Sequence, residues 1–177
     1  MMEYEEVENM NEKIAADLYV AASQYCTFIE HGADFDKEQI LDYMLKILPL
    51  LYIKGGLLNS EETDEVLTCE QCVTEEEYES VFLLLKNKLE SEDYFDSYDI
   101  QLGETQSVSL CEHVADIYQD LKDFVLLFSK NTITARLSAA YLCKMRYAGG
   151  WGKKILTIMP YLHVMMYKDE SNEDMYL

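Results

Sequence analysis

The stretch SVSLCEHVADIYQDLKDFVLLF, residues 107–128, decides the fold of this chain. Its large apolar residues recur at steps of four and three, the spacing that places side chains on one face of an α-helix. Ser107 precedes them as the expected N-cap, because a serine hydroxyl can accept a bond from a free backbone N–H of the first turn. The stretch therefore predicts one helix of a packed bundle, with an apolar seam made of Leu110, Val114, Ile117, Leu121, Phe124 and Phe128.

Four carboxylates share one side of the same helix: Glu112, Asp116, Asp120 and Asp123. They lie about 125° around the helix from the apolar seam. One interpretation is a site that holds a metal ion or a substrate, and the other is a solvated or salt-bridged acidic stripe. Di-metal bundles combine carboxylates with a histidine three residues after a glutamate, and none of the three histidines in this sequence follows a glutamate in that way. We therefore favour the solvated or salt-bridged stripe.

The rest of the sequence continues the helical pattern. Two prolines and seven glycines among 177 residues are too few turn-forming residues for an all-β protein. Pro49 predicts a kink or break near residue 46. The fold class is therefore all-α, a single-domain bundle of about six helices over residues 1–167 with no significant sheet, followed by an acidic tail, 168–177, that we expect to be disordered. Apolar periodicity places the five other helices at about 5–31, 37–56, 75–89, 132–148 and 152–167.

Charge divides the chain into three parts. The formal net charge is −20: residues 1–123 carry −23, residues 124–168 contain no acid and carry +7, and residues 169–177 carry −4. A protein this acidic repels nucleic acids and anionic membrane surfaces. The basic part either forms a patch for a phosphate, a carboxylate metabolite or an acidic protein, or pairs with acidic helices of the same chain. We favour the internal pairing, because dedicated anion sites are few per protein.

Residues 91–106 form the longest irregular stretch, and they are rich in tyrosine and aspartate. A connection of this length is typical of a functional loop or of a mobile one. Tyr94 and Tyr98 are candidate partner contacts, because aromatic residues are enriched at interfaces.

The sequence GGWGKK, residues 149–154, partly matches the motif of a phosphate-binding loop. It lacks the first glycine of that motif and the serine or threonine after the lysine. We expect a hinge instead, with Trp151 packed across it and available to a partner. Lys153 and Lys154 would lie in the first turn of the last helix, where free N–H groups and two ammoniums favour a small anion. Lys144, on an apolar face of the preceding helix, is a further candidate for anion or partner contact.

The pair in CEQC, Cys69 and Cys72, has the spacing of half a zinc site. Zinc needs four ligands, and no second pair of this kind follows in the sequence. The neighbouring glutamates oppose the low thiol pKa that redox chemistry needs. We expect two ordinary thiols here, with a metal site as the alternative, and no cofactor.

The sequence favours a non-enzymatic, cytoplasmic protein. It contains no Gly-x-Ser-x-Gly elbow and no cysteine-protease signature. No apolar run reaches the roughly 20 residues that cross a bilayer, and the acidic N-terminus lacks the features of a signal peptide. Five cysteines, an odd number, fit a secreted disulfide framework poorly.

Four stretches carry a resemblance to a known family: LKILPLLYIKGGLL (45–58), VTEEEYESV (73–81), HVADIYQDLKDFV (113–125) and WGKKILTIMPYLH (151–163). In order and extent they resemble one uncharacterised bacterial family, domain of unknown function 5063, and the third stretch is the most specific. The chain departs from the family pattern around 131–150, where an acid-free helix ends in Gly-Gly-Trp-Gly. The resemblance implies a compact helical domain without an assigned activity, so it supplies no catalytic residues.

These observations lead to one expectation and two alternatives. We expect a monomer or homodimer that acts by contact with another protein, whose identity the sequence does not indicate, and that binds neither nucleic acid nor membrane. The first alternative is a small-anion sensor or enzyme with a lysine-rich pocket near Gly149–Lys154. The second is a metal site at Cys69 and Cys72.

Overall fold

A computed structural model of the protein describes residues 2–60, 72–130 and 132–167, and side chains from residue 11 onward. Within these residues the chain forms six helices, so the predicted all-α fold class is confirmed. The predicted tail, 168–177, lies outside the described residues. The helices are α1 (Met2–Glu30), α2 (Lys37–Leu57), α3 (Glu75–Leu89), α4 (Leu110–Phe128), α5 (Ile133–Gly149) and α6 (Trp151–Tyr167), with short 3-10 turns at Gly32–Asp34 and Glu90–Glu92.

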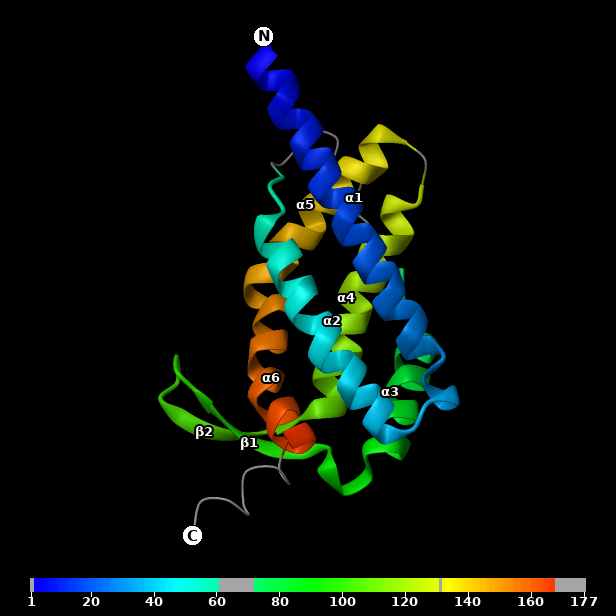
Figure 1. The fold of residues 1–177 in the computed structure, drawn as a ribbon, viewed down its shortest axis with the longest axis vertical. Helices are drawn as coiled ribbons and strands as arrows, with labels where there is room; N and C mark the ends of the chain where they lie inside the picture. The colour runs from blue at the N-terminus through cyan, green and yellow to red at the C-terminus, as the bar shows by residue number, and fades with distance from the viewer. Residues whose placement is uncertain (1, 61–71, 131, 168–177) are drawn as a thin grey trace.

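The helix predicted from residues 107–128 is the central one. α4 contacts α1, α3, α5 and α6, and the other helices surround it (Figure 1). Its six seam residues are all buried. Full burial of one such side chain contributes about 1.5–3 kcal/mol, so this seam alone is a large part of the core. None of the described helices combines the length and apolarity needed to cross a membrane.

The helix ends follow local hydrogen bonding. Capping boxes start α2 at Asp36 and α3 at Thr74, and in each the side chain accepts a bond from the backbone three residues on. The N-cap of α4 is Ser109 and not Ser107, because the Ser109 side chain accepts from the N–H of Glu112. α2 continues through Pro49, so the predicted break does not occur. Packing against α1, α5 and α6 supports that helix on several sides.

The stretch predicted to be irregular, 91–106, is largely a β-hairpin. Strand β1 (Tyr94–Asp99) pairs antiparallel with β2 (Glu104–Ser109), from Tyr94 opposite Ser109 to Asp99 opposite Glu104. The turn closes where the N–H of Gly103 donates to the Asp99 carbonyl at 2.8 Å, with Gly103 at a φ of 71° that favours glycine. The hairpin projects from the bundle beside α6 (Figure 1). It is a small addition to a helical domain.

Candidate functional site

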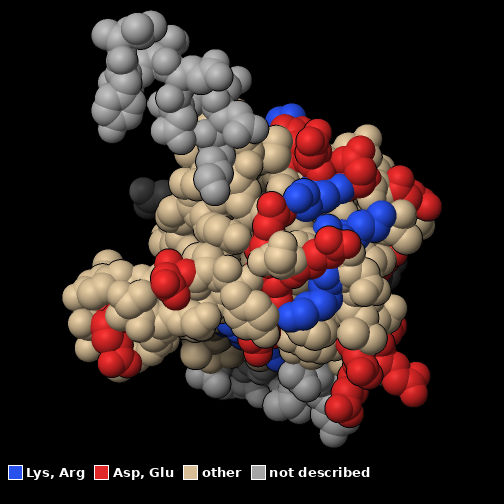
Figure 2. Space-filling view, turned by 90° about the horizontal axis from the view of Figure 1, so that it is seen from below, with Lys and Arg blue, Asp and Glu red and all other residues tan. Residues whose placement is uncertain are grey.

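A groove of about 1210 Å³ lies between the hairpin and α6, and we refer to it as the hairpin groove. One wall is β1, where each residue from Phe95 to Asp99 borders the groove. The other wall is α6, which contributes the exposed side chains of Leu156, Pro160 and Val164. Seen from below, the hairpin stands out from the bundle as an arm with few charged side chains (Figure 2). This space exceeds the roughly 300–1,000 Å³ of small-molecule sites.

One buried carboxylate, Asp93, anchors the base of the hairpin. Its side chain accepts bonds from the Lys86 ammonium at 2.6 Å, the Ser109 hydroxyl at 2.8 Å and the N–H of Cys111 at 2.8 Å. Burial would raise the pKa of Asp93, but the bonds from Lys86 and from the N–H of Cys111 outweigh burial and hold that pKa below its ordinary value. Asp93 thus joins α3, the end of β2 and the start of α4. Sequence analysis missed it, because nothing nearby in sequence marks it as buried.

Contacts near both ends of β1 hold the hairpin and the preceding 3-10 turn against α6. The rings of Phe95 and Tyr161 stack with their centres 4.3 Å apart, and the Tyr161 hydroxyl donates to the carbonyl of Glu92 at 3.0 Å. Nearer the turn, the Lys153 ammonium lies 3.6 Å from the Asp99 carboxylate. An isolated two-stranded hairpin is marginally stable, so these contacts and Asp93 hold the groove open in one shape.

The candidate anion residues Lys153 and Lys154 both border the groove, and both already face carboxylates of this chain. Lys153 faces Asp99, and the Lys154 ammonium lies 2.9 Å from the carboxylate of Asp116 on α4. A bound anion would therefore compete with internal partners. Lys144 does not border the groove; its ammonium lies 5.8 Å from the centre of the Tyr147 ring.

His113 also borders the groove. Burial, and to a smaller degree the nearby Lys154 ammonium, lower the pKa of His113, so the imidazole is neutral at neutral pH. Its Nδ1 atom has no hydrogen-bond partner within the described residues.

Burial raises the pKa of the thiols of Cys26, Cys111 and Cys143 well above the ordinary value, so these thiols are poor nucleophiles.

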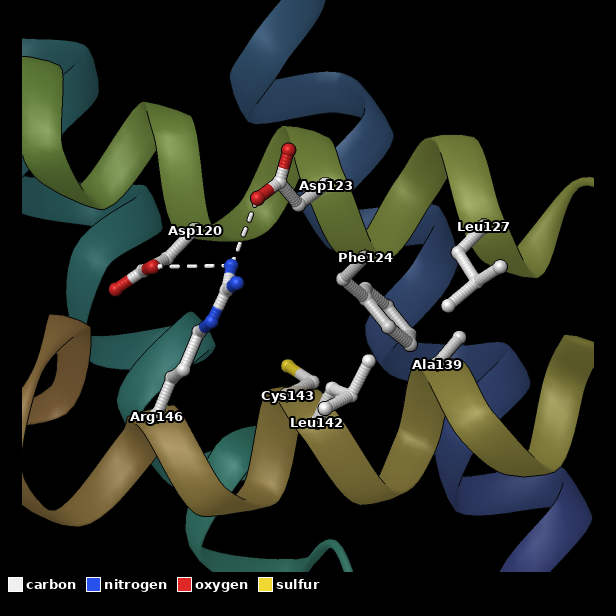
Figure 3. A pocket seen from close by; sticks show the side chains of 8 residues that line it. All are labelled: Asp120, Asp123, Phe124, Leu127, Ala139, Leu142, Cys143 and Arg146. Atoms are coloured by element: carbon white, nitrogen blue, oxygen red, sulfur yellow. Dashed lines mark hydrogen bonds and ion pairs between the residues drawn. The ribbon is translucent and has the colours of Figure 1, made fainter. Parts of the chain in front are cut away.

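Three of the four carboxylates of the acidic stripe bind side chains or backbone of this chain. The Arg146 guanidinium lies between Asp123, at 2.7 Å, and Asp120, at 3.4 Å (Figure 3). Asp123 is buried and also accepts from the N–H groups of Cys72 and Val73. Asp116, bonded to Lys154, also accepts from the Tyr78 hydroxyl at 2.9 Å. Glu112 is exposed.

The carboxylates of the acidic stripe therefore connect α4 to neighbouring helices by ion pairs and hydrogen bonds. Burial raises the pKa of Asp120 more than Arg146 and Lys154 lower it. The cavity beside Asp120, Asp123 and Arg146 is about 10 Å³, the size of a single water molecule (Figure 3). It has no room for a substrate.

The hinge residue Trp151 is completely buried, so its prediction as a partner contact is wrong. Its ring packs against Tyr147 and against Gly55 of α2, and its indole N–H donates to the carbonyl of Cys143 at 3.1 Å. In contrast, Tyr94 and Tyr98 are 61% and 62% exposed. Tyr98 borders the hairpin groove, so one predicted contact residue and both hinge lysines meet there.

The metal candidates are only partly described. Cys69 lies outside the described residues, and Cys72 begins the segment that leads to α3. In the ranges that the structure covers, no group of three or more His, Cys, Asp or Glu side chains is arranged to hold a metal ion.

Comparison with known proteins identifies a family and a similar solved structure. The family model described as Domain of unknown function (DUF5063) matches residues 9–168. The crystal structure of protein BF1032 from Bacteroides fragilis is similar to this fold with a TM-score of 0.77 and 30% sequence identity, covering 88% of this chain and 93% of that chain. No curated protein matches the chain. Neither description states an activity, a ligand or a partner.

Proposed function

This chain belongs to the DUF5063 family, and we propose that it acts through protein contact, binding a segment of another protein in the hairpin groove. The exposure of apolar side chains along both walls is the observation that carries this proposal. Tyr98 is 62% exposed, Leu156 53% and Val164 54%. Apolar side chains that converge on one groove at the surface are typical of sites for another macromolecule.

The anchoring of the hairpin supports the proposal. Asp93 fixes the base of the hairpin, and the stack of Phe95 on Tyr161 fixes β1 to α6. A surface that keeps its shape before binding loses less conformational entropy when the partner arrives.

The proposed role is non-enzymatic, and we place the protein in the cytoplasm. The described side chains around the groove include one imidazole, His113, and its Nδ1 atom has no serine or cysteine as a hydrogen-bond partner within the described residues. General base catalysis of nucleophilic attack needs such a pair within hydrogen-bond reach. The location rests on the odd number of cysteines, which fits poorly with disulfide bonding in an oxidising compartment.

Substitution at one wall of the groove tests this proposal. Leu156→Asp puts a charge on the groove wall, and Ile133→Asp, at the first residue of α5, which is 79% exposed and does not border the groove, is the matched control. Tagged full-length chains are purified from the native host, and co-purifying proteins are quantified by mass spectrometry. We expect a partner that remains with the unaltered chain and with Ile133→Asp and is depleted about tenfold or more with Leu156→Asp. Equal recovery with both variants would contradict the proposal.

The small-anion alternative is tested by thermal unfolding in millimolar inorganic phosphate and citrate. Because Asp99 and Asp116 already occupy Lys153 and Lys154, we expect no rise in Tm. A rise that disappears in a Lys153→Ala, Lys154→Ala variant would favour the anion sensor.

A further inference from the structure

The outer edge of β1 is free. β1 pairs with β2, and apart from the turn bond from Gly103 to Asp99 no other described residue forms a backbone hydrogen bond with it. Residues of both parities from Phe95 to Asp99 border the groove, together with Gln106 and Val108 of β2, so the groove covers one face of the hairpin and continues around the edge of β1. β1 contains no proline or lysine, and its register with β2 is one to one without a bulge. Proline, lysine and bulges are features that natural proteins commonly use to prevent an exposed edge from pairing, and β1 has none of these three.

The two walls of the groove run side by side. Phe95 stacks on Tyr161, and Asp99 contacts Lys153, so β1 and α6 are antiparallel. The four residue steps from Phe95 to Asp99 span about 13 Å of strand, and the eight from Lys153 to Tyr161 span about 12 Å of helix. The strand and the helix therefore advance by the same distance between the two contacts. A linear segment laid along the edge of β1 would therefore also run along α6.

The apolar residues of the helix wall have the spacing of an extended chain. Leu156, Pro160 and Val164 follow one another at intervals of four residues, about 6 Å along a helix axis. Alternate side chains of a strand recur at about 6.6 Å. Three alternate side chains of an extended segment can therefore each meet one residue of this wall.

The charges that remain unpaired at the hairpin are negative. Lys153 and Lys154 face carboxylates, whereas the exposed Asp96 and Glu104 form no ion pair with another described residue. The net charge of the chain is −20, which attracts basic segments and opposes association with a second copy.

We propose that the partner binds as an extended, basic segment that adds as a third strand to the free edge of β1, with alternate apolar side chains against α6. This inference rests on the proposed function. Backbone hydrogen bonds to β1 would supply affinity, and the α6 wall would select the side chains, as in strand-addition complexes generally. Basic residues of the segment would face Asp96, which borders the groove.

A displayed library of random 12-residue peptides tests the inference. Peptides are selected on the full chain and counter-selected on the Leu156→Asp variant. Selected peptides are then synthesised with an N-methyl group at one backbone position at a time, which removes one donor in each. We expect about tenfold weaker Kd at alternate positions only, because only every second N–H of an added strand faces β1. We also expect the selected peptides to be enriched in Lys and Arg. Their binding should weaken as the NaCl concentration rises from about 0.05 to about 0.5 M, because salt screens the attraction between charges.

Three results would overturn the inference, and they separate it from the proposed function. Groove-dependent peptides that are helical when bound, or that tolerate N-methylation throughout, would overturn strand addition and leave the proposed function standing. Groove-dependent peptides without basic residues or salt dependence would overturn the predicted charge of the partner. Failure to select any peptide that depends on Leu156 would overturn both the inference and the proposed function.

Discussion

Asp93 joins three elements around the hairpin groove without bordering it. Its carboxylate bonds Lys86 of α3, Ser109 at the end of β2 and the N–H of Cys111 in α4. A buried charge with several donors is stable only while those donors stay in place, so Asp93 couples the position of the hairpin to the bundle. Asp93 therefore affects the groove indirectly, by fixing the position of the hairpin strands.

Asp93→Asn should lower the free energy of unfolding by about 2 kcal/mol at pH 7, because the charge that binds Lys86 is lost while an acceptor for Ser109 remains. The folded-state pKa of Asp93 lies below the ordinary value, so its ionisation stabilises the fold at neutral pH and this contribution falls as the pH drops below about 3.9. Urea unfolding at several pH values should show the difference between the two proteins shrinking below that pH. Asp96→Asn, at an exposed acid, is the control and should change stability by no more than about 0.5 kcal/mol. Equal effects at the two positions would contradict this account.

Gly55 allows α2 to approach α6 closely. A methyl group at Gly55 would lie 2.2 Å from Cη2 of Trp151 and 2.7 Å from Cδ2 of Tyr147. Gly55→Ala should therefore reduce the stability by about 1–3 kcal/mol through overpacking. Gly149→Ala is the matched control, because no atom lies within 4 Å of the added methyl group, and it should be neutral or stabilising by up to about 1 kcal/mol. Thermal unfolding of both variants checks this, and a stable Gly55→Ala protein would mean that the helices are farther apart.

At the scale of elements, the hairpin depends on α6. Phe95→Ala removes the stack on Tyr161, worth about 1 kcal/mol, so amide hydrogen exchange in β1 and β2 should become roughly fivefold faster. Exchange in the core of α4 should not change. Tyr98→Ala, on the opposite face of the same strand, should have a smaller effect on exchange. Uniformly faster exchange in the helices would show that Phe95 belongs to the global core instead.

The helices could be predicted from sequence because their apolar residues keep a local period. The seam of α4 and the capping boxes of α2 and α3 rely on residues within one or two turns of each other. The hairpin could not be predicted in this way. Its turn lacks the Asn-Gly or Asp-Gly pair that marks short hairpins, and β2 is mostly exposed and polar, so no alternation shows. The stack on Tyr161, distant in sequence, and the bonds that Asp93 accepts from Ser109 and Cys111 stabilise it.

The candidate site was only partly predictable for the same reason. Tyr98, Lys153 and Lys154 were identified from residue type and spacing, and the structure brings them to one groove. The burial of Trp151 depends on Gly55, which lies in another helix. No local pattern in GGWGKK reports such a contact.

At the scale of the molecule, acidic and basic helices lie together. Arg146 of α5 and Lys154 of α6 pair with carboxylates of α4, and Arg136 of α5 lies 3.6 Å from Glu12 of α1. The basic C-terminal helices are thus largely engaged within the chain, and the outer field remains acidic. This arrangement favours a basic partner, for which we propose the hairpin groove as the binding surface.

We propose that another protein binds in the hairpin groove. Site-specific photo-cross-linking tests it most directly, with a photoreactive phenylalanine analogue placed at Tyr98 or Val164 in the groove or at Ile133 outside it, in the full chain in its native host. We predict one discrete adduct, the same for Tyr98 and Val164 and absent for Ile133. Adducts that form equally at Ile133, or none at either groove position, would contradict the claim.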